Sequence, residues 1–249
     1  MTGYRTCIFD LYGTLVDIHT DEDAPGLWTA IADYYRAQGA AYGPEELRSS
    51  YLRLVREAES RAAPLRRDAH EAHPEIQLER VFARLFREKG ASADLPQAVQ
   101  AGRRFRELST EYIRLYGGAK ELLTALRERG CRLWLLSNAQ AIFTRWELER
   151  LGLAGCFDGI YLSSDYGVKK PDRRFFEVLL RKENILPEQA VMIGNDGVCD
   201  IAGARGVGLD TVYLRSNLSP DEPVPQAGYV LEHMNLKQLQ SFLTEEEAR

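Results

Sequence analysis

Short apolar segments alternate with longer segments of helical periodicity, and this alternation constrains the fold more than any other feature. The apolar segments cover residues 4–9, 132–136, 159–162, 190–193 and 211–214. Each has the length of a buried strand. Between them apolar side chains recur at helical spacing, as at Leu122, Leu123 and Leu126. Strands that alternate with helices in this way predict an α/β fold with a mostly parallel sheet.

Residues 20 to about 114 interrupt the alternation. Their apolar residues recur at helical spacing, from Leu27 and Ile31 to Tyr112 and Ile113, and Gly and Pro residues separate the periods. We therefore predict about four helices inserted after the first strand. Because such an insert must pack mainly on itself, we divide the chain into a core of residues 1–18 and 115–249 and an inserted domain of residues 19–114. The proline-containing segment 219–226 is expected to be a surface loop.

Composition narrows the possible partners and location. The net charge of −5 argues against general nucleic-acid binding, which relies on clustered Lys and Arg. No segment approaches the roughly 20 apolar residues of a membrane span, so we expect no membrane partner. The first residues lack the apolar region of a signal peptide. The four cysteines show no C-x-x-C pairing, so we expect free thiols and a cytoplasmic protein.

Acidic side chains follow two of the predicted strands. Asp10 follows the first strand and precedes a Gly-Thr turn that contains Thr14, and Asn195, Asp196 and Asp200 follow the strand at 190–193. In a parallel α/β sheet the carboxyl ends of the strands are where ligands bind. An Asp there can act as a nucleophile, and paired carboxylates suit Mg²⁺, which prefers oxygen ligands. Taken separately, each motif is also compatible with capping of a turn or helix.

Two further motifs carry hydrogen-bond donors and positive charge. Ser137 and Asn138 end the segment that begins at residue 132, and both can donate hydrogen bonds to a phosphoryl oxygen. Lys169 and Lys170 stand where a predicted helix begins, which already carries partial positive charge. This placement hints at an anionic ligand. Taken alone, the first motif is more simply interpreted as a capped turn, and the second as a solvated lysine pair.

Together, and in this order, the four motifs resemble those of the haloacid dehalogenase (HAD) superfamily, whose members are mostly phosphohydrolases with an aspartyl nucleophile. The resemblance extends over the whole chain. It includes a helical cap inserted between the first and second motifs, the arrangement called a C1 cap. The resemblance implies a Rossmann-like parallel sheet core with an inserted helical cap domain.

The resemblance also implies catalytic roles. Asp10 attacks phosphorus and binds Mg²⁺, together with the backbone carbonyl of Tyr12 and the carboxylate of Asp196. Asp200 orients the water molecules around the metal or Lys170, and Lys170 neutralises the gathering negative charge. A carboxylate that attacks a phosphate dianion meets like-charge repulsion, which a divalent cation and a Lys offset.

The remaining motif residues are expected to bind substrate or to support the metal. Ser137 and the backbone around Asn138 hold the phosphoryl oxygens, and we place Thr14 with them. Asn195 lies beside the metal ligand Asp196 and is expected to support it.

Tyr12 departs from the phosphatase pattern. Typical HAD phosphatases have a second Asp two residues after the nucleophile, which protonates the leaving group and later activates water. Loss of a general acid or base commonly costs about 10²–10⁴-fold in rate. A Tyr at this position resembles the 2-haloacid dehalogenase branch, in which halide leaves without protonation and no metal is needed.

The other motifs favour phosphoryl chemistry. Dehalogenases replace the acid pair with a Ser- and Asn-rich pattern before one Asp, whereas this chain has both Asp196 and Asp200. Besides Tyr12, Asn195 resembles the dehalogenase pattern, but no Arg near residues 27–29 matches the carboxylate-binding cap segment of the dehalogenases. We expect a Mg²⁺-dependent phosphohydrolase acting on a small phosphate monoester or acyl phosphate. A metal-independent 2-haloacid dehalogenase-like hydrolase and a non-catalytic binding or regulatory protein are the alternatives.

The substrate is expected to be a small phosphorylated metabolite, and the protein a monomer or a homodimer. With Tyr12 in place of the acid, a proton must come from elsewhere, or the substrate must have a good leaving group. The candidate donors lie where the chain leaves the core for the cap: Asp17, His19, Asp21, Glu22 and Asp23. A merely solvated acidic hinge is the simpler interpretation of this segment.

Overall fold

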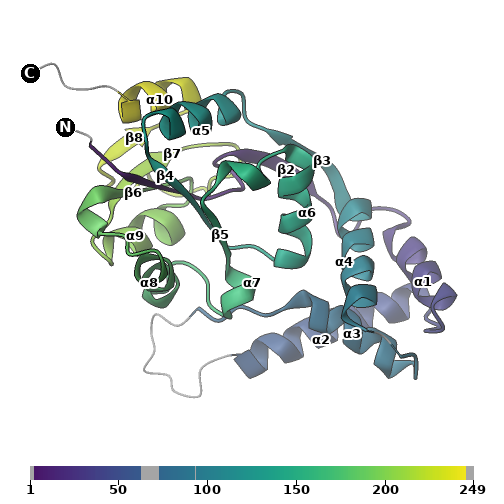
Figure 1. Cartoon of the computed structure of the whole chain (residues 1–249). Helices are drawn as coiled ribbons and strands as arrows, with labels where there is room; N and C mark the ends of the chain where they lie inside the picture. Colours follow the sequence, from purple (N-terminus) through teal and green to yellow (C-terminus); the bar gives the residue numbers. More distant parts are fainter. Residues whose placement is uncertain (1–2, 63–72, 93, 245–249) are drawn as a thin grey trace, which may run out of the picture.

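The computed structural model describes residues 3–62, 73–92 and 94–244. A six-stranded sheet with the strand order β5-β4-β1-β6-β7-β8 forms the core (Figure 1), and every neighbouring pair of strands is parallel. The strands are β1 (Thr6–Phe9), β4 (Arg132–Ser137), β5 (Gly159–Leu162), β6 (Ala190–Gly194), β7 (Asp210–Leu214) and β8 (Tyr229–Leu231). The predicted α/β fold is confirmed. The sequence predicted five of these strands, and β8 was missed.

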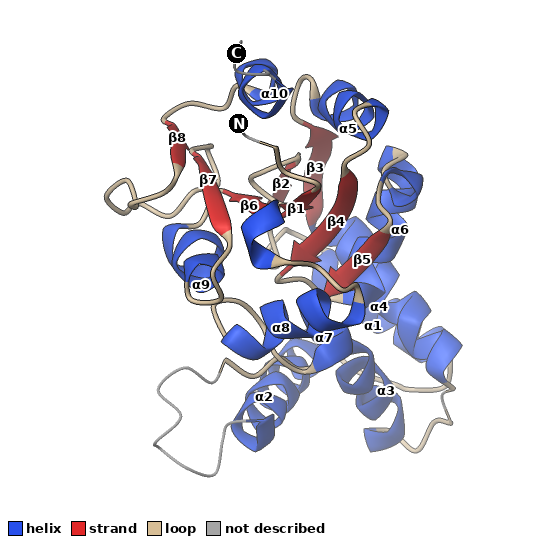
Figure 2. Cartoon of the chain, turned by 60° about the vertical axis from the view of Figure 1, so that its left-hand side comes forward, coloured by secondary structure: helices blue, strands red, loops and turns tan. Residues whose placement is uncertain are grey.

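Helices cover both faces of the sheet, because successive strand side chains point to opposite faces. Phe9 of β1 packs in one cluster with side chains of α5 (Ala119–Glu128) and α10 (Leu236–Thr244), which lie side by side (Figure 2). Ile8 packs on the other face with α8 (Arg173–Lys182). The remaining core helices are α6 (Ala141–Leu151), α7 (Ser163–Tyr166) and α9 (Gly203–Arg205), with short helical turns η1 (Ala154–Cys156), η2 (Pro187–Gln189) and η3 (Gly197–Ala202).

In the described part of the inserted cap there are four helices: α1 (Leu27–Ala37), α2 (Pro44–Ala62), α3 (Leu78–Glu88) and α4 (Leu95–Ser109). They share an aromatic cluster in which Tyr35 stacks on Phe86 with ring centroids 4.2 Å apart. Ile142 of α6 joins this cluster, and a Cβ added to Gly102 of α4 would lie 2.3 Å from its Cδ1. The cap therefore packs closely against α6 of the core at this point.

A two-stranded antiparallel ribbon joins cap and core. It pairs β2 (Val16–Thr20) with β3 (Thr110–Leu115), so the predicted boundaries at 18/19 and 114/115 fall inside its strands. The sequence analysis placed Tyr112 and Ile113 in a helical pattern, and this was wrong. Their spacing from Phe105 fits a helix, but pairing with β2, a segment distant in sequence, makes them a strand.

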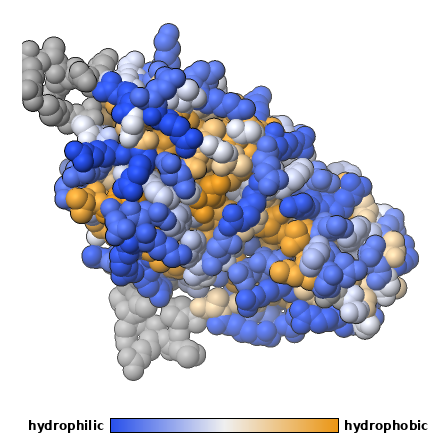
Figure 3. Space-filling model, in the orientation of Figure 1, coloured by the Kyte–Doolittle hydropathy of each residue, from blue (hydrophilic) through white to orange (hydrophobic). Residues whose placement is uncertain are grey.

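Polar residues cover most of the face seen in Figure 3, with hydrophobic residues in small groups between them. In the described part of the chain, no helix combines the length and apolar character needed to cross a bilayer.

Candidate active site

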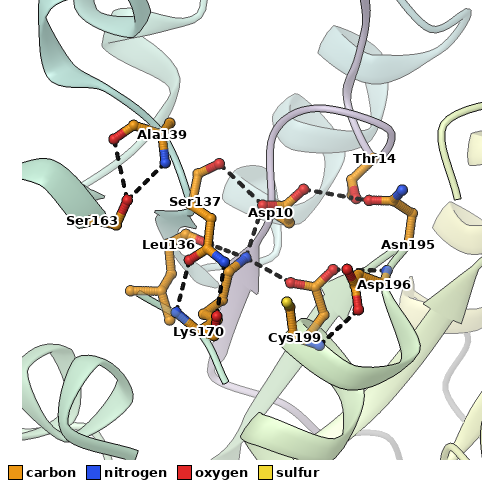
Figure 4. A network of polar contacts seen from close by, with 12 residues as sticks. Asp10, Thr14, Leu136, Ser137, Ala139, Ser163, Lys170, Asn195, Asp196 and Cys199 are labelled. Atoms are coloured by element: carbon orange, nitrogen blue, oxygen red, sulfur yellow. Dashed lines mark hydrogen bonds and ion pairs between the residues drawn. The ribbon is translucent and has the colours of Figure 1, made fainter. Parts of the chain in front are cut away.

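Polar side chains from the loops after β1, β4 and β6 converge with Lys170 at one edge of the sheet (Figure 4). They line a cavity of about 180 Å³. Its lining consists of Asp10, Tyr12, Ser137, Asn138, Lys170, Asn195, Asp196, Cys199, Asp200, Leu218 and Pro220. β1 lies between β4 and β6 in the sheet. This order brings together the loops that were predicted to carry the chemistry.

Lys170 is held between two carboxylates at the bottom of this site. Its Nζ lies 2.8 Å from Oδ1 of Asp10 and 2.6 Å from Oδ1 of Asp200, and it donates to the carbonyl of Leu136. The lysine is 2% exposed. Burial alone would lower the pKa of Lys170, but the two carboxylates outweigh it and raise the pKa above its usual value. The ammonium group is therefore charged at neutral pH.

Hydroxyl groups on either side orient the Asp10 carboxylate. Ser137 Oγ donates to Asp10 Oδ1 at 3.1 Å, and Thr14 Oγ1 lies 3.5 Å from Oδ2. Thr14 also donates to Oδ1 of Asn195 at 3.3 Å. The turn that places Thr14 requires Gly13, which has φ +83°, and an added Cβ would lie 2.3 Å from Asn195 Nδ2. Thr14, expected to hold phosphoryl oxygens, and Asn195, expected to support Asp196, thus form a hydrogen-bonded pair beside Asp10.

The side chain of Asn138 is used within the protein. Its Nδ2 donates to the Lys170 carbonyl at 2.9 Å, and its Oδ1 accepts from the Lys170 backbone N–H at 2.7 Å. This pair of hydrogen bonds fixes the segment that carries Lys170. Asn138 lines the cavity, but its amide group is bound to the backbone of Lys170. The binding of phosphoryl oxygens by the backbone around Asn138 stays a prediction.

Asp196 and Asp200 have different environments. Asp196 Oδ1 caps η3 by accepting from the backbone N–H groups of Val198 and Cys199, at 2.9 and 2.7 Å. Asp200 Oδ2 accepts from the backbone N–H of Asp196 at 3.0 Å, and its other oxygen binds Lys170. Gly194 lets Asp200 approach, since an added Cβ there would lie 2.2 Å from Asp200 Oδ2. Asp200 therefore contacts Lys170 directly, and its orienting role stays a prediction.

The donor set of the cavity fits a Mg²⁺ ion. The capping hydrogen bonds of Asp196 use only Oδ1, and among the described residues Asp10 Oδ2 has only the long contact to Thr14. Tyr12, whose backbone carbonyl is the other predicted ligand, lines the same cavity. Among all the residues that the structure describes, no group of three or more His, Cys, Asp or Glu side chains is arranged to hold a metal ion. Mg²⁺ in proteins often uses only one or two carboxylates and keeps several waters.

The hydroxyl group of Tyr12 is committed to an interface between core and cap. It donates to Glu147 Oε2 in a short hydrogen bond and lies 2.9 Å from Thr144 Oγ1, both on α6. Arg106 of α4 donates to Glu147 Oε1 at 2.7 Å, and its guanidinium lies over the Tyr12 ring, 5.9 Å from the centroid. Burial and the Glu147 carboxylate raise the pKa of Tyr12. The hydroxyl group is therefore bound in this network.

Sequence reasoning missed Arg106, Thr144 and Glu147. Each sits in a helix where a polar residue is ordinary, and only burial distinguishes them: the Glu147 side chain is 2% exposed. Leu218, Pro220 and Cys199 in the cavity lining were also missed. Leu218 and Pro220 belong to no motif, and Cys199 stands between the two acids of the last motif at a position for which no role was predicted.

The hinge residues proposed as proton donors do not line the cavity. Asp17 accepts from Arg114 Nη2 at 2.7 Å and from Asn217 Nδ2 at 2.9 Å. Burial favours its neutral form, but these hydrogen bonds outweigh burial and lower the pKa of Asp17. Asp17 is therefore a carboxylate at neutral pH. His19 faces Glu111 at 3.6 Å, and both side chains are more than half exposed.

An aspartate at the end of the first strand, a buried lysine beside it, an acid pair after β6 and an inserted helical cap together define a HAD-like hydrolase. The comparison with family models agrees, because residues 4–208 match the haloacid dehalogenase-like hydrolase family. The chain belongs to this family.

Relatives with a known name include phosphatases. The phosphoserine phosphatase of Thermus thermophilus is 33% identical over 156 residues, which are 60% of this chain and 63% of that enzyme. The chain thus matches less than two-thirds of the length of this relative.

Solved structures show the same fold over nearly the whole chain. The 2-haloacid dehalogenase of Pseudomonas syringae pv. tomato DC3000 has a TM-score of 0.62 at 23% identity, and the match covers 96% of this chain and 98% of the dehalogenase chain. The HAD-hydrolase YfnB of Bacillus subtilis, solved bound to magnesium, has a TM-score of 0.56 at 23% identity, with coverage of 97% and 99%. At this identity the matches support the fold.

Proposed function

We propose that this chain is a Mg²⁺-dependent phosphohydrolase that forms an aspartyl-phosphate at Asp10. The observation that carries the proposal is the position of Asp10 between two kinds of groups in one cavity. On the β4 side lie the ammonium group of Lys170 and the hydroxyl group of Ser137. On the β6 side lies Asp196, whose Oδ2 is not used by the capping hydrogen bonds of η3.

The proposed reaction has two displacements at phosphorus. In the first, an Asp10 carboxylate oxygen bonds to phosphorus, and the bond between phosphorus and the leaving oxygen breaks. In the second, the oxygen of a water molecule bonds to phosphorus and the bond between phosphorus and the Asp10 oxygen breaks. Phosphate leaves with the protons of the water, and the Asp10 carboxylate is regenerated. Asp10, Asp196 and the Tyr12 carbonyl would hold Mg²⁺, which neutralises the charge of the phosphoryl group when bound.

The protein's own residues perform the remaining tasks. Lys170 binds phosphoryl oxygens and offsets the repulsion between the phosphate and Asp10. The ion pair with Asp200 holds the ammonium group in position for this task. Ser137 holds the Asp10 carboxylate in place and faces the same cavity. The cavity of about 180 Å³ is smaller than the roughly 300–1,000 Å³ typical of drug-sized ligands, which supports a small substrate.

The contacts of Tyr12 favour a substrate with a good leaving group. Its hydroxyl is bound to Glu147 and Thr144, and Asp17 is a carboxylate paired with Arg114. Neither group offers a proton to a leaving alkoxide. An acyl phosphate or another activated phosphate needs no such proton, because its leaving group is a weak base. We therefore propose acyl phosphates and activated esters ahead of simple alkyl phosphates.

A substrate panel with and without Mg²⁺ tests the proposal. It contains acetyl phosphate, p-nitrophenyl phosphate, glycerol phosphate and 2-chloropropionate, and Asp10→Asn is the control. We expect Mg²⁺-dependent phosphate release, fastest from acetyl phosphate, and none from Asp10→Asn. Chloride release in excess EDTA would favour the dehalogenase alternative. No turnover and no Mg²⁺ binding by calorimetry would favour a non-catalytic protein.

A further inference from the structure

Two apolar side chains from one loop line the otherwise mainly polar catalytic cavity. Leu218 and Pro220 belong to the loop that follows β7, and both are half-buried. Leu218 is a member of none of the three hydrophobic clusters formed by the described residues. A half-buried leucine outside these clusters that faces a ligand cavity points to a contact with the ligand.

The sheet order places this loop opposite the groups that would bind the phosphoryl oxygens. Ser137 ends β4, on one side of β1. β6 and then β7 lie on the other side of β1, so Leu218 flanks Asp10 from the direction away from Ser137. A phosphoryl group bound by Ser137 and Lys170 leaves the carbon part of the substrate free to face Leu218.

Local hydrogen bonds give this loop a defined shape. The Ser216 hydroxyl accepts from the Leu218 backbone N–H at 3.2 Å, and the Ser219 hydroxyl accepts from the Ser216 backbone N–H at 3.0 Å. The backbone N–H of Ser219 also donates to the Ser216 carbonyl at 3.2 Å. These bonds form a tight turn around residue 217.

Asn217 anchors the turn to the ribbon between core and cap. Its Nδ2 donates to Asp17 Oδ1 at 2.9 Å, and its Oδ1 accepts from the Tyr116 hydroxyl at 2.6 Å. Asp17, 3% exposed, is itself fixed by Arg114. Because Leu218 directly follows the anchored Asn217, its position at the cavity is fixed by these bonds.

We propose that Leu218 and Pro220 form an apolar wall that contacts the carbon part of the substrate and selects substrates by its shape. Asn217 is a positioning residue for this wall. The inference rests on the proposed function, and it names the part of the substrate that the core domain recognises. Phosphorylated compounds with an apolar or aromatic group next to the phosphate would gain from this wall, and compact ones would gain little.

The test compares an aryl with an acyl substrate in wild type, Leu218→Ala and Leu218→Trp. The measured quantity is the ratio of kcat/KM for p-nitrophenyl phosphate to that for acetyl phosphate. A changed contact in an apolar pocket commonly alters kcat/KM by about 10–200-fold, so we expect Leu218→Trp to lower this ratio at least about tenfold. We expect Leu218→Ala to lower it less, through a higher KM for the aryl substrate.

Val224→Trp is the matched control, because Val224 is in the same loop region but lines a different cavity and is 42% exposed. We expect the ratio of kcat/KM for the aryl substrate to that for the acyl substrate to be the same in Val224→Trp as in wild type. Asn217→Ala should raise KM for the aryl substrate while kcat stays within about threefold, a split that general loss of structure would not produce. Thermal unfolding of each variant establishes that it is folded, and Leu218→Ala serves if the Trp variant does not fold.

The outcomes separate the two proposals. A wild type that hydrolyses both substrates, with the same ratio in all Leu218 variants, overturns the apolar wall and leaves the proposed function in place. A wild type that hydrolyses neither substrate contradicts the proposed function and the wall with it. A lowered ratio in both Leu218 variants and an unchanged ratio in Val224→Trp supports the wall.

Discussion

Lys170 Nζ lies 2.6 Å from Asp200 Oδ1, and both residues are at least 98% buried. The same ammonium group contacts Asp10 at 2.8 Å. Burial raises the pKa of Asp200 to about 7, although Lys170 opposes this effect. When both acids are ionised, two carboxylates and one ammonium group leave a net negative charge, which a divalent cation would compensate. The lysine is charged before substrate arrives, so it does not have to reorganise when charge builds up on the phosphoryl group.

Removal of the lysine charge tests this arrangement. Lys170→Met should lower kcat by at least about 10²-fold, because a preorganised charge at the phosphoryl site is lost. It should also destabilise the fold by about 3–5 kcal/mol, because the two buried carboxylates lose their common partner. Steady-state kinetics and denaturant unfolding measure the two effects. Lys169→Met is the matched control, since Lys169 forms no ion pair among the described residues. Equal effects in both variants would contradict the assigned role.

Gly13 allows the nucleophile loop to approach Asn195. Gly13 and Gly39 have similar φ angles of +83° and +86°, but only Gly13 has a neighbour in the way of a Cβ. Gly39→Ala should cost about 1–2 kcal/mol for the left-handed backbone alone. Gly13→Ala should cost at least about 1 kcal/mol more because of the overlap. Denaturant unfolding of both variants measures the difference, and equal destabilisation would show that the Asn195 contact is not tight.

Tyr12 can be replaced by the acid that typical family phosphatases have. Tyr12→Asp should raise the ratio of glycerol phosphate to acetyl phosphate turnover at least about tenfold, since a general acid commonly contributes about 10²–10⁴-fold. The variant should also be less stable, because Glu147 and Thr144 lose the tyrosine hydroxyl. In the control Tyr12→Asn, the side chain has a shape similar to that of Asp but no acidic proton, so this variant should show no gain in the ratio. A gain in both variants, or in neither, would mean that the missing acid does not limit alkyl ester hydrolysis.

Stability should depend on pH through Asp17. The hydrogen bonds from Asn217 and Arg114 lower the pKa of Asp17 below its ordinary value of 3.8. A lowered pKa in the folded state gives a stabilisation that is present above the unfolded value and is lost as pH falls through the folded value. The stability difference between wild type and Asp17→Asn should therefore be constant above about pH 5 and shrink below about pH 4. Urea unfolding from pH 3 to pH 7 measures it, and a difference that grows on acidification would contradict the assignment.

The sequence predicted the parts of the molecule that short-range patterns determine. Asp10 directly follows a strand, Ser137 ends one and Asp196 stands two residues after one. The apolar residues of each strand revealed it, and parallel strands bring such ends together. The buried Lys170 was placed near an anionic ligand because a positive charge at a helix start is otherwise unfavourable.

Features that depend on distant partners were not predictable. The β2–β3 ribbon forms between segments almost 100 residues apart, and Tyr112 also fitted the helical pattern of α4. The partnership of Tyr12 with Glu147 and Arg106 joins three separate elements, and no local pattern marks it. Leu218 belongs to no motif. Its neighbour Asn217 is held by a hydrogen bond to Asp17, which lies 200 positions away in the sequence.

The central claim is that phosphorus becomes covalently bound to Asp10. Acid quenching of the enzyme during turnover of acetyl phosphate with Mg²⁺, followed by mass spectrometry of the peptide that contains residue 10, measures this bond directly. We predict a phosphoryl group on Asp10 in wild type and none in Asp10→Asn or in the presence of EDTA. Sustained phosphate release by Asp10→Asn, or a phosphoryl group on a different residue of the wild type, would contradict the claim.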